Sequence, residues 1–275
     1  MKLQQLFYTS LITATVSFSS CNNADKKTEP EQKEPKLKEE NVSYTGDSVT
    51  MNGYIVYDEN KEGARPAVLV IPEWWGLNDY AKNRARQLAD LGYIAMAVDM
   101  YGNGKTADNP DSAGKYAMPF YKNPQMMKAR FDAALNKLKT YSQMDSTKIA
   151  AIGYCFGGAQ ALNLARMGED LKGVVSFHGN LIGVPLDKSK LKADILVCHG
   201  AADPFVSQEE VDKFKKQMDS VGAKYTFKAY DGAVHAFTNP NATEMGEKFK
   251  IPIKYDAVAD AASWNDMKEF FGRIF

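Results

Sequence analysis

The sequence has no excess of charge of either sign, because 34 lysine and arginine residues balance 34 aspartate and glutamate residues. It has no basic stripe interleaved with aromatic residues, so nucleic acid is not expected as a partner. The apolar run at residues 6–18 is too short to cross a bilayer as a helix. There is no internal repeat, and histidine and cysteine occur only three times each. The 275 residues, 44% hydrophobic and 25% charged, predict a globular protein with a sizeable core.

The N-terminus has the pattern of a secretion signal. Met1-Lys2 carries positive charge, the apolar run follows, and the segment ends in Phe18-Ser19-Ser20-Cys21. Small residues directly before a cysteine are typical of a lipoprotein signal peptide. We expect residues 1–20 to be cleaved and Cys21 to be lipidated, giving an exported bacterial lipoprotein of the cell envelope that faces the periplasm or the cell surface. The alternative is an ordinary signal peptide with an incidental cysteine.

The segment after Cys21 is strongly polar. Residues 21–42 are rich in lysine, glutamate, aspartate and proline, and a segment of this composition cannot bury a core. We predict a flexible tether there, so that the lipid is the only contact with the membrane. Residues 43–275 are then predicted to form the folded domain.

Apolar runs and amphipathic segments alternate along this domain. Strands are expected at residues 49–57, 66–72, 93–98, 148–154, 173–177, 193–198 and 225–230, and helices at 79–91, 125–141, 157–166, 208–220 and 256–275. This order predicts an α/β fold whose mostly parallel sheet has helices on both faces. Functional groups then collect beyond the carboxyl ends of the strands. Residues 101–123 have no clear periodicity and are expected to form a cap over the site.

The pentapeptide Gly153-Tyr154-Cys155-Phe156-Gly157 lies between a predicted strand and a predicted helix. This is the cysteine form of the nucleophile elbow of α/β-hydrolases, so Cys155 is the candidate nucleophile. The positive N-terminus of the helix favours a thiolate, and the N–H of Phe156 is the expected oxyanion donor. The alternatives are a buried structural cysteine and a disulfide with Cys198. The glycine spacing does not fit a dinucleotide fingerprint, and neither a cofactor nor a metal is expected.

A cysteine nucleophile needs a base, and the three histidines are His178, His199 and His235. The chain order of nucleophile, acid and histidine in this fold points to His235, in a glycine-rich loop after the last strand. Asp203 follows a strand and fits the acid that orients the imidazole, or alternatively the N-cap of the next helix. His178 and His199 end strands, where they either line the site or pack beneath the loops.

Four motifs together resemble the dienelactone hydrolase family. They are the segment 71–78 (Ile-Pro-Glu-Trp-Trp-Gly-Leu-Asn), the elbow with Gly158, the turn at 200–206 and the segment 232–237 (Gly-Ala-Val-His-Ala-Phe). The resemblance runs in order from about residue 52 to the C-terminus. It implies an α/β-hydrolase fold and a triad of Cys155, His235 and Asp203. It further implies that Glu73 helps to form the thiolate and that the Trp74 N–H is the second oxyanion donor.

The sequence departs from that family where substrate is bound. Dienelactone hydrolases hold a substrate carboxylate with two arginines, and the corresponding positions here are Asn103 and Asn239. Lys105 is close enough in sequence to replace the first arginine. An uncharged or differently charged ester or lactone is therefore expected as readily as dienelactone. Further residues expected at the pocket, by their places next to the motifs, are Trp75, Tyr101, His178, Phe205 and Phe237.

These patterns predict a hydrolase that cleaves a small ester or lactone through a thioester acyl-enzyme. One alternative is a lipid-anchored binding protein on an inactive hydrolase scaffold, because a fold does not guarantee activity. Another is a peptidase of the same fold. No pattern in the sequence defines an oligomeric state.

Overall fold

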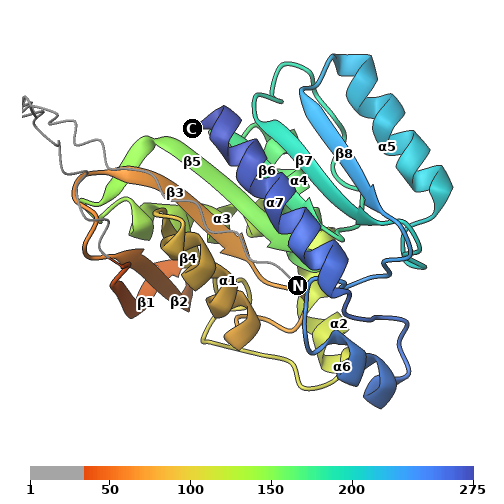
Figure 1. The fold of residues 1–275 in the computed structure, drawn as a ribbon, viewed down its shortest axis with the longest axis horizontal. Helices are drawn as coiled ribbons and strands as arrows, with labels where there is room; N and C mark the ends of the chain where they lie inside the picture. The colour runs from red at the N-terminus through yellow and green to blue at the C-terminus, as the bar shows by residue number, and fades with distance from the viewer. Residues whose placement is uncertain (1–33) are drawn as a thin grey trace, which may run out of the picture. The chain divides into compact units, whose positions relative to one another are not determined.

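A computed structural model of the chain describes residues 34–275. The predicted signal peptide, the lipidated Cys21 and the first part of the predicted tether lie outside the described residues. Within them, eight strands form one sheet in the order β1-β2-β4-β3-β5-β6-β7-β8 (Figure 1). Their bounds are β1 (Leu37–Gly46), β2 (Val49–Asp58), β3 (Arg65–Ile71), β4 (Ile94–Ala97), β5 (Met144–Tyr154), β6 (Gly173–Phe177), β7 (Asp194–Gly200) and β8 (Tyr225–Tyr230). The pairs β1–β2 and β2–β4 are antiparallel, and all pairs from β4 to β8 in this order are parallel.

Helices cover both faces of this sheet. One face carries α1 (Asp79–Asp90) and α7 (Ala257–Ile274), which lie in front of the sheet in Figure 1. The other carries α2 (Pro110–Lys122), α3 (Pro124–Leu138), α4 (Phe156–Met167) and α5 (Gln208–Val221). The short helix α6 (Ala242–Phe249) lies between β8 and α7 in the chain. The predicted mostly parallel α/β sheet with two helical layers is confirmed.

The central strands are apolar throughout because both of their faces are buried. In β3, Leu69 and Ile71 face the layer that holds α3 and α4, whereas Val68 and Val70 face the layer that holds α1 and α7. All four side chains are fully buried. Burial of one such side chain contributes about 1.5–3 kcal/mol, so the two layers together fix the centre of the sheet.

Three parts of the sequence prediction need correction. The domain begins before residue 43, because residues 37–42 belong to β1 instead of a tether and pair with β2. The segment 101–123 contains α2, and α6 had no predicted counterpart. Both β1, at the sheet edge, and the short α6 are rich in exposed polar residues, so neither gives a strong apolar pattern. Of the helices within residues 34–275, none is both long and apolar enough to cross a membrane.

The new N-terminal boundary can be tested by truncation. A chain that begins at Ser43 loses the outer half of β1, including the hydrogen bond of 2.9 Å from the Tyr141 hydroxyl to Glu40. We expect it to be less stable than a chain that begins at Glu34 by about 2–4 kcal/mol, since each of several lost hydrogen bonds contributes about 1 kcal/mol. Urea denaturation followed by tryptophan fluorescence measures the difference. If the two chains had the same urea midpoint and the same slope, residues 37–42 would not contribute to the fold and would belong to the tether.

Candidate active site

Cys155 occupies a sharp turn between β5 and α4. Its backbone has φ 52° and ψ −114°, a conformation that a residue with a side chain rarely adopts. The flanking glycines are needed because the backbones nearly touch. A Cβ on Gly153 would lie 2.0 Å from the Gly157 carbonyl oxygen, and a Cβ on Gly157 would lie 2.1 Å from the Ile71 carbonyl oxygen. The predicted elbow is therefore formed, with the half-buried thiol presented beyond the sheet.

The two predicted oxyanion donors, the N–H groups of Phe156 and Trp74, lie at a helix start and in a turn. Cys155 is the N-cap of α4 and its side chain makes no capping hydrogen bond, so the N–H of Phe156 is one of the donors that a helix start leaves free. Trp74 belongs to a turn in which the Gly76 N–H donates to the Glu73 carbonyl oxygen at 3.1 Å. The Tyr101 hydroxyl donates to the Trp74 carbonyl oxygen at 2.8 Å, and this hydrogen bond stabilises the turn.

His235 and Asp203 are hydrogen-bonded, with 2.8 Å between Nδ1 and Oδ2. The other oxygen of Asp203 accepts the Phe205 N–H at 2.8 Å, so the carboxylate is held from both sides. Since Nδ1 donates to Asp203, Nε2 of His235 is free to accept a proton. Burial lowers the pKa of His235, but interaction with Cys155 and with Asp203 outweighs it and raises the pKa above its ordinary value.

Two alternatives from the sequence are wrong. Asp203 does not cap α5, because the N-cap is Ser207, which forms a reciprocal capping box with Glu210. Cys155 and Cys198 are both free thiols and form no disulfide. Cys198 is fully buried in β7, and burial raises its pKa to about 12, as suits an unreactive core thiol.

Glu73 is a buried carboxylic acid on the turn after β3, and its side chain is only 2% exposed. Its Oε2 accepts a hydrogen bond of 2.6 Å from the Asn239 amide. The Asn239 oxygen in turn accepts the Asn241 N–H at 3.0 Å, which fixes the direction of the amide. Burial raises the pKa of Glu73 to about 7, while Asn239, His235 and Arg84 oppose the rise. Glu73 is therefore poised to gain or lose a proton at neutral pH.

One cavity of about 230 Å³ brings these groups together. Glu73, Cys155, Asn180 and His235 supply its polar wall. Its remaining lining, apart from Ala236, is large and apolar: Trp74, Trp75, Tyr121, Phe205, Ile251 and Ile253. No lysine or arginine is among the residues that line it. Within residues 34–275, no three histidine, cysteine, aspartate or glutamate side chains are grouped as ligands for a metal ion.

The structure places the predicted pocket residues in two groups. Trp75 and Phe205 line the cavity as predicted. Five others do not line it: Tyr101, His178, Phe237 and Asn239 are buried behind its wall, and Asn103 is exposed, with its N–H bonded to the Thr50 carbonyl oxygen at 2.7 Å. Lys105 is also exposed and does not line the cavity. The open question of whether Lys105 replaces a substrate-binding arginine therefore finds no support in the geometry.

The predicted cap, residues 101–123, contributes Tyr121 to the cavity wall, but sequence reasoning missed the part of the wall formed by the segment after α6. Tyr121 comes from α2, and Ile251 and Ile253 follow α6. Ile253 pairs with His235 in a parallel bridge, and the Lys254 N–H donates to the His235 carbonyl oxygen at 3.2 Å. Phe249 stacks on Trp75 with 5.9 Å between the ring centroids. The only available signal was the apolar pair Ile251 and Ile253 in an otherwise polar stretch.

A parallel sheet between two helical layers, with a cysteine on the turn from β5 to α4, defines an α/β-hydrolase. The chain belongs to the dienelactone hydrolase family, whose model matches residues 51–275. The predicted resemblance and the predicted hydrolase class are thereby confirmed.

Individual relatives cover most of the chain. It is 30% identical to Protein usf of Aquifex pyrophilus over 84% of its own length and 96% of that protein. It is 28% identical to a probable 2-oxo-3-(5-oxofuran-2-ylidene)propanoate lactonase of Bradyrhizobium, over 74% of this chain and 82% of the lactonase. Among solved structures, it matches a dienelactone hydrolase-like promiscuous phosphotriesterase from metagenomic libraries with a TM-score of 0.81 and 37% identity, covering 87% and 99% of the two chains.

The raised pKa of Glu73 predicts a pH-dependent cost in stability. The folded state retains the proton up to a pH of about 7, whereas the unfolded chain releases it near 4.5. Between these values the folded state binds more protons, so the contribution of Glu73 to stability falls as pH rises. Glu73→Gln removes this cost while it keeps an acceptor for Asn239. We expect the variant to gain about 3 kcal/mol relative to wild type between pH 4.5 and pH 8, at 1.4 kcal/mol per pKa unit.

Urea unfolding of both proteins at pH 4.5, 6 and 8 gives this difference directly, and other titrating groups cancel in the comparison. If the difference in the free energy of unfolding between wild type and Glu73→Gln stayed the same from pH 4.5 to pH 8, Glu73 would have an ordinary pKa in the folded protein.

Proposed function

We propose that this protein hydrolyses a small ester or lactone with Cys155 as nucleophile, His235 as base and Asp203 as the residue that orients the base. The observation that carries the proposal is the Asp203–His235 hydrogen bond of 2.8 Å beside Cys155, within one cavity. The raised pKa of His235 reflects its interaction with Cys155 as well as with Asp203. A nucleophile, a base and an orienting acid are what acyl transfer to sulfur requires.

The reaction proceeds in two steps. Glu73 takes the proton of the Cys155 thiol, the sulfur attacks the carbonyl carbon, and the oxyanion is held by the N–H groups of Phe156 and Trp74. His235, protonated at Nε2, gives its proton to the leaving alkoxide, and a thioester remains on Cys155. A water molecule then attacks the thioester, with its proton passing to His235. The acid product leaves as Glu73 returns its proton to the Cys155 sulfur, while His235 keeps the proton from the water molecule and is ready for the next cycle.

Glu73 fits a role as the first proton acceptor. A cysteine thiol is mostly protonated at neutral pH and attacks slowly in that form. Glu73 lines the same cavity as Cys155, and its pKa of about 7 is close to the operating pH of a general base. The hydrogen bond from Asn239 holds its carboxylate in place at the cavity wall.

The substrate is proposed to be uncharged around its reacting carbonyl. Glu73 contributes a negative charge to the cavity, and none of the lining residues is a lysine or an arginine. The apolar walls, which include Trp75 and Phe205, instead suit a flat or branched hydrocarbon group next to the ester. Because a neutral phosphate triester shares these properties, and one similar structure is a promiscuous phosphotriesterase, such a triester is the second candidate substrate.

The place of the protein in the cell is also a proposal. The sequence of residues 1–21 fits an exported lipoprotein anchored through Cys21. A lipid-anchored enzyme of this kind would meet small esters that enter the cell envelope.

The nucleophile is tested by exchanging it. Cys155→Ala is expected to lose activity on p-nitrophenyl acetate by about 1,000-fold or more, because the thioester cannot form. Cys198→Ala is the matched control, since Cys198 is buried in β7 and does not line the cavity. It should keep turnover near that of the wild type. Electrospray mass spectrometry after rapid acid quenching should show an acyl adduct on the wild-type protein. Full activity of Cys155→Ala would refute the mechanism, and the absence of activity from the wild type across esters, lactones and peptides would favour a binding protein.

The charge preference is tested with two esters of equal size. One carries a methyl group and the other a carboxylate at the same position of the acyl chain. We expect kcat/KM for the carboxylate ester to be lower by about tenfold or more, because the added carboxylate meets Glu73 and apolar walls, and no lysine or arginine lines the cavity to bind it. In Glu73→Gln, which removes the opposing charge, the values of kcat/KM for the methyl and carboxylate esters should lie closer together. An equal or higher kcat/KM for the carboxylate ester would show that a cation reaches the substrate.

A further inference from the structure

His178 is a fully buried histidine at the end of β6 that the proposed reaction leaves without a role. It does not line the cavity, yet its ring lies edge-on to the base His235, with 5.2 Å between centroids. Its own backbone has φ 41°, which is unfavourable for histidine. The hydrogen bonds of His178 explain why a buried polar residue with this backbone conformation lies next to the reacting groups.

Both ring nitrogens of His178 are bonded to residues that control the site. Nδ1 lies 3.1 Å from the backbone nitrogen of Cys155, and Nε2 lies 2.7 Å from Oγ1 of Thr238. The Cys155 N–H is a donor, so Nδ1 is the acceptor and the ring proton is on Nε2, where it donates to Thr238. Burial, together with His235 and Arg84, holds the pKa of His178 well below its ordinary value, so the ring stays neutral in this tautomer.

Thr238 fixes the loop that carries the base. It lies three residues after His235 and is fully buried. Its Oγ1 also lies 2.6 Å from the Tyr80 hydroxyl, and its carbonyl oxygen accepts a hydrogen bond of 2.6 Å from Arg84.

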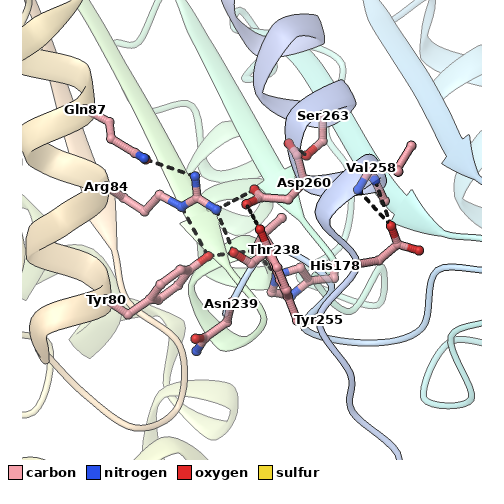
Figure 2. A network of polar contacts seen from close by, with 12 residues as sticks. Tyr80, Arg84, Gln87, His178, Thr238, Asn239, Tyr255, Val258, Asp260 and Ser263 are labelled. Carbon is pink, nitrogen blue, oxygen red and sulfur yellow. Dashed lines mark hydrogen bonds and ion pairs between the residues drawn. The ribbon is translucent and has the colours of Figure 1, made fainter. Parts of the chain in front are cut away.

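Figure 2 shows this network, in which Arg84 from α1 also meets Asp260 from α7. Arg84 is only 4% exposed, and neither it nor Tyr80, His178 or Thr238 is among the residues that line the cavity. The loop that carries His235 is thereby tied to both helices of one layer.

We propose that His178 is a positioning residue that sets the separation between nucleophile and base by joining the Cys155 backbone to Thr238. The inference rests on the proposed function, since it concerns how Cys155 and His235 are held for the same reaction. The nucleophile sits at the end of β5 and the base sits after β8, and two strands lie between them in the sheet. A single imidazole spans this gap behind the reacting atoms. A displacement of about 1 Å between such groups can cost about 100-fold in rate.

The test removes the link without touching Cys155 or His235. Thr238→Val has nearly the same shape but no hydroxyl, and Thr238→Ser keeps the hydroxyl. On p-nitrophenyl acetate we expect Thr238→Val to lower kcat by about 10- to 100-fold with little change in KM, and Thr238→Ser to stay within about threefold of wild type. The rate of Cys155 alkylation by iodoacetamide at neutral pH should fall with kcat, because His235 no longer meets the thiol.

Two further variants separate positioning from stability. Tyr80→Phe removes the bond from Tyr80 to Thr238 but leaves the His178 link, so it should reduce stability with a much smaller effect on kcat. His178→Asn tolerates the positive φ and keeps an acceptor for the Cys155 N–H, yet it is too short to reach Thr238. It should lose kcat as Thr238→Val does. The double variant should be no slower than either single variant, because both break one link.

The outcomes separate this inference from the proposed function. Activity that survives in Cys155→Ala would remove the proposed function itself. If Cys155→Ala is inactive while a folded Thr238→Val retains the kcat and alkylation rate of the wild type, the positioning role is wrong and the function stands. Losses in the double variant that equal the product of the single losses would likewise overturn the link, since they would show two independent effects.

Discussion

The active site depends on holding the Cys155 backbone in a conformation that it would not adopt alone. A residue at φ 52° and ψ −114° costs about 1–3 kcal/mol, and it persists only where its surroundings determine it. Here the surroundings are the backbones of two neighbouring strands. The Cys155 N–H is shared between the Phe177 carbonyl oxygen at 3.0 Å and His178 Nδ1 at 3.1 Å. On the other side, Gly157 packs directly on the carbonyl of Ile71. The elbow is thus held by β3 and β6, the two strands that flank β5.

The parallel register of the sheet then decides which other groups can reach the thiol. Ile71 pairs with Gly153, and Tyr154 pairs with Phe177, so the ends of β3, β5 and β6 lie level. The next residues along the chain beyond these ends include Glu73, Cys155 and His178. Asp203 and His235 follow β7 and β8, so every polar group of the proposed mechanism stands just beyond a carboxyl end. Functional groups gather at one edge because parallel strands all end there.

This regularity explains how much the sequence alone could predict. Strands buried on both faces, such as 148–154, give continuous apolar runs, and each chemical group comes directly after one of them. Cys155, Asp203, His235 and Glu73 could therefore be located by motif and by chain order. The structure brings Cys155, His235 and Glu73 to one cavity, and Asp203 is hydrogen-bonded to His235. The parts missed were those with a mixed pattern. The edge strand β1 carries three consecutive charged residues and few apolar ones, and it resembles a tether until its pairing with β2 is seen.

The pocket was harder to predict for a related physical reason. A side chain next to a motif can point into the cavity or behind it, and the sequence does not distinguish the two. Tyr101 was expected to contact substrate, but it donates to the Trp74 carbonyl oxygen and packs on Phe156 at 5.9 Å. His178 was expected at the wall and lies behind it. Conversely, Tyr121 and Ile253 come from segments without a motif, and their place depends on tertiary contacts alone.

The result is a site with two unlike sides. Behind the reacting groups the polar atoms are buried and bonded to one another, as in the network of Arg84, Thr238 and His178. In front, the wall is apolar and comes from α2, from the segment after α6 and from the loops after β3 and β7. Phe205 and Tyr121 remain 47% and 42% exposed there. A change at the front alters only packing against substrate, whereas a change at the back leaves buried polar groups unpaired, at a cost of about 1–3 kcal/mol each. The chemistry is therefore fixed by the sheet and its polar backing, and the choice of substrate can vary through the apolar segments without disturbing it.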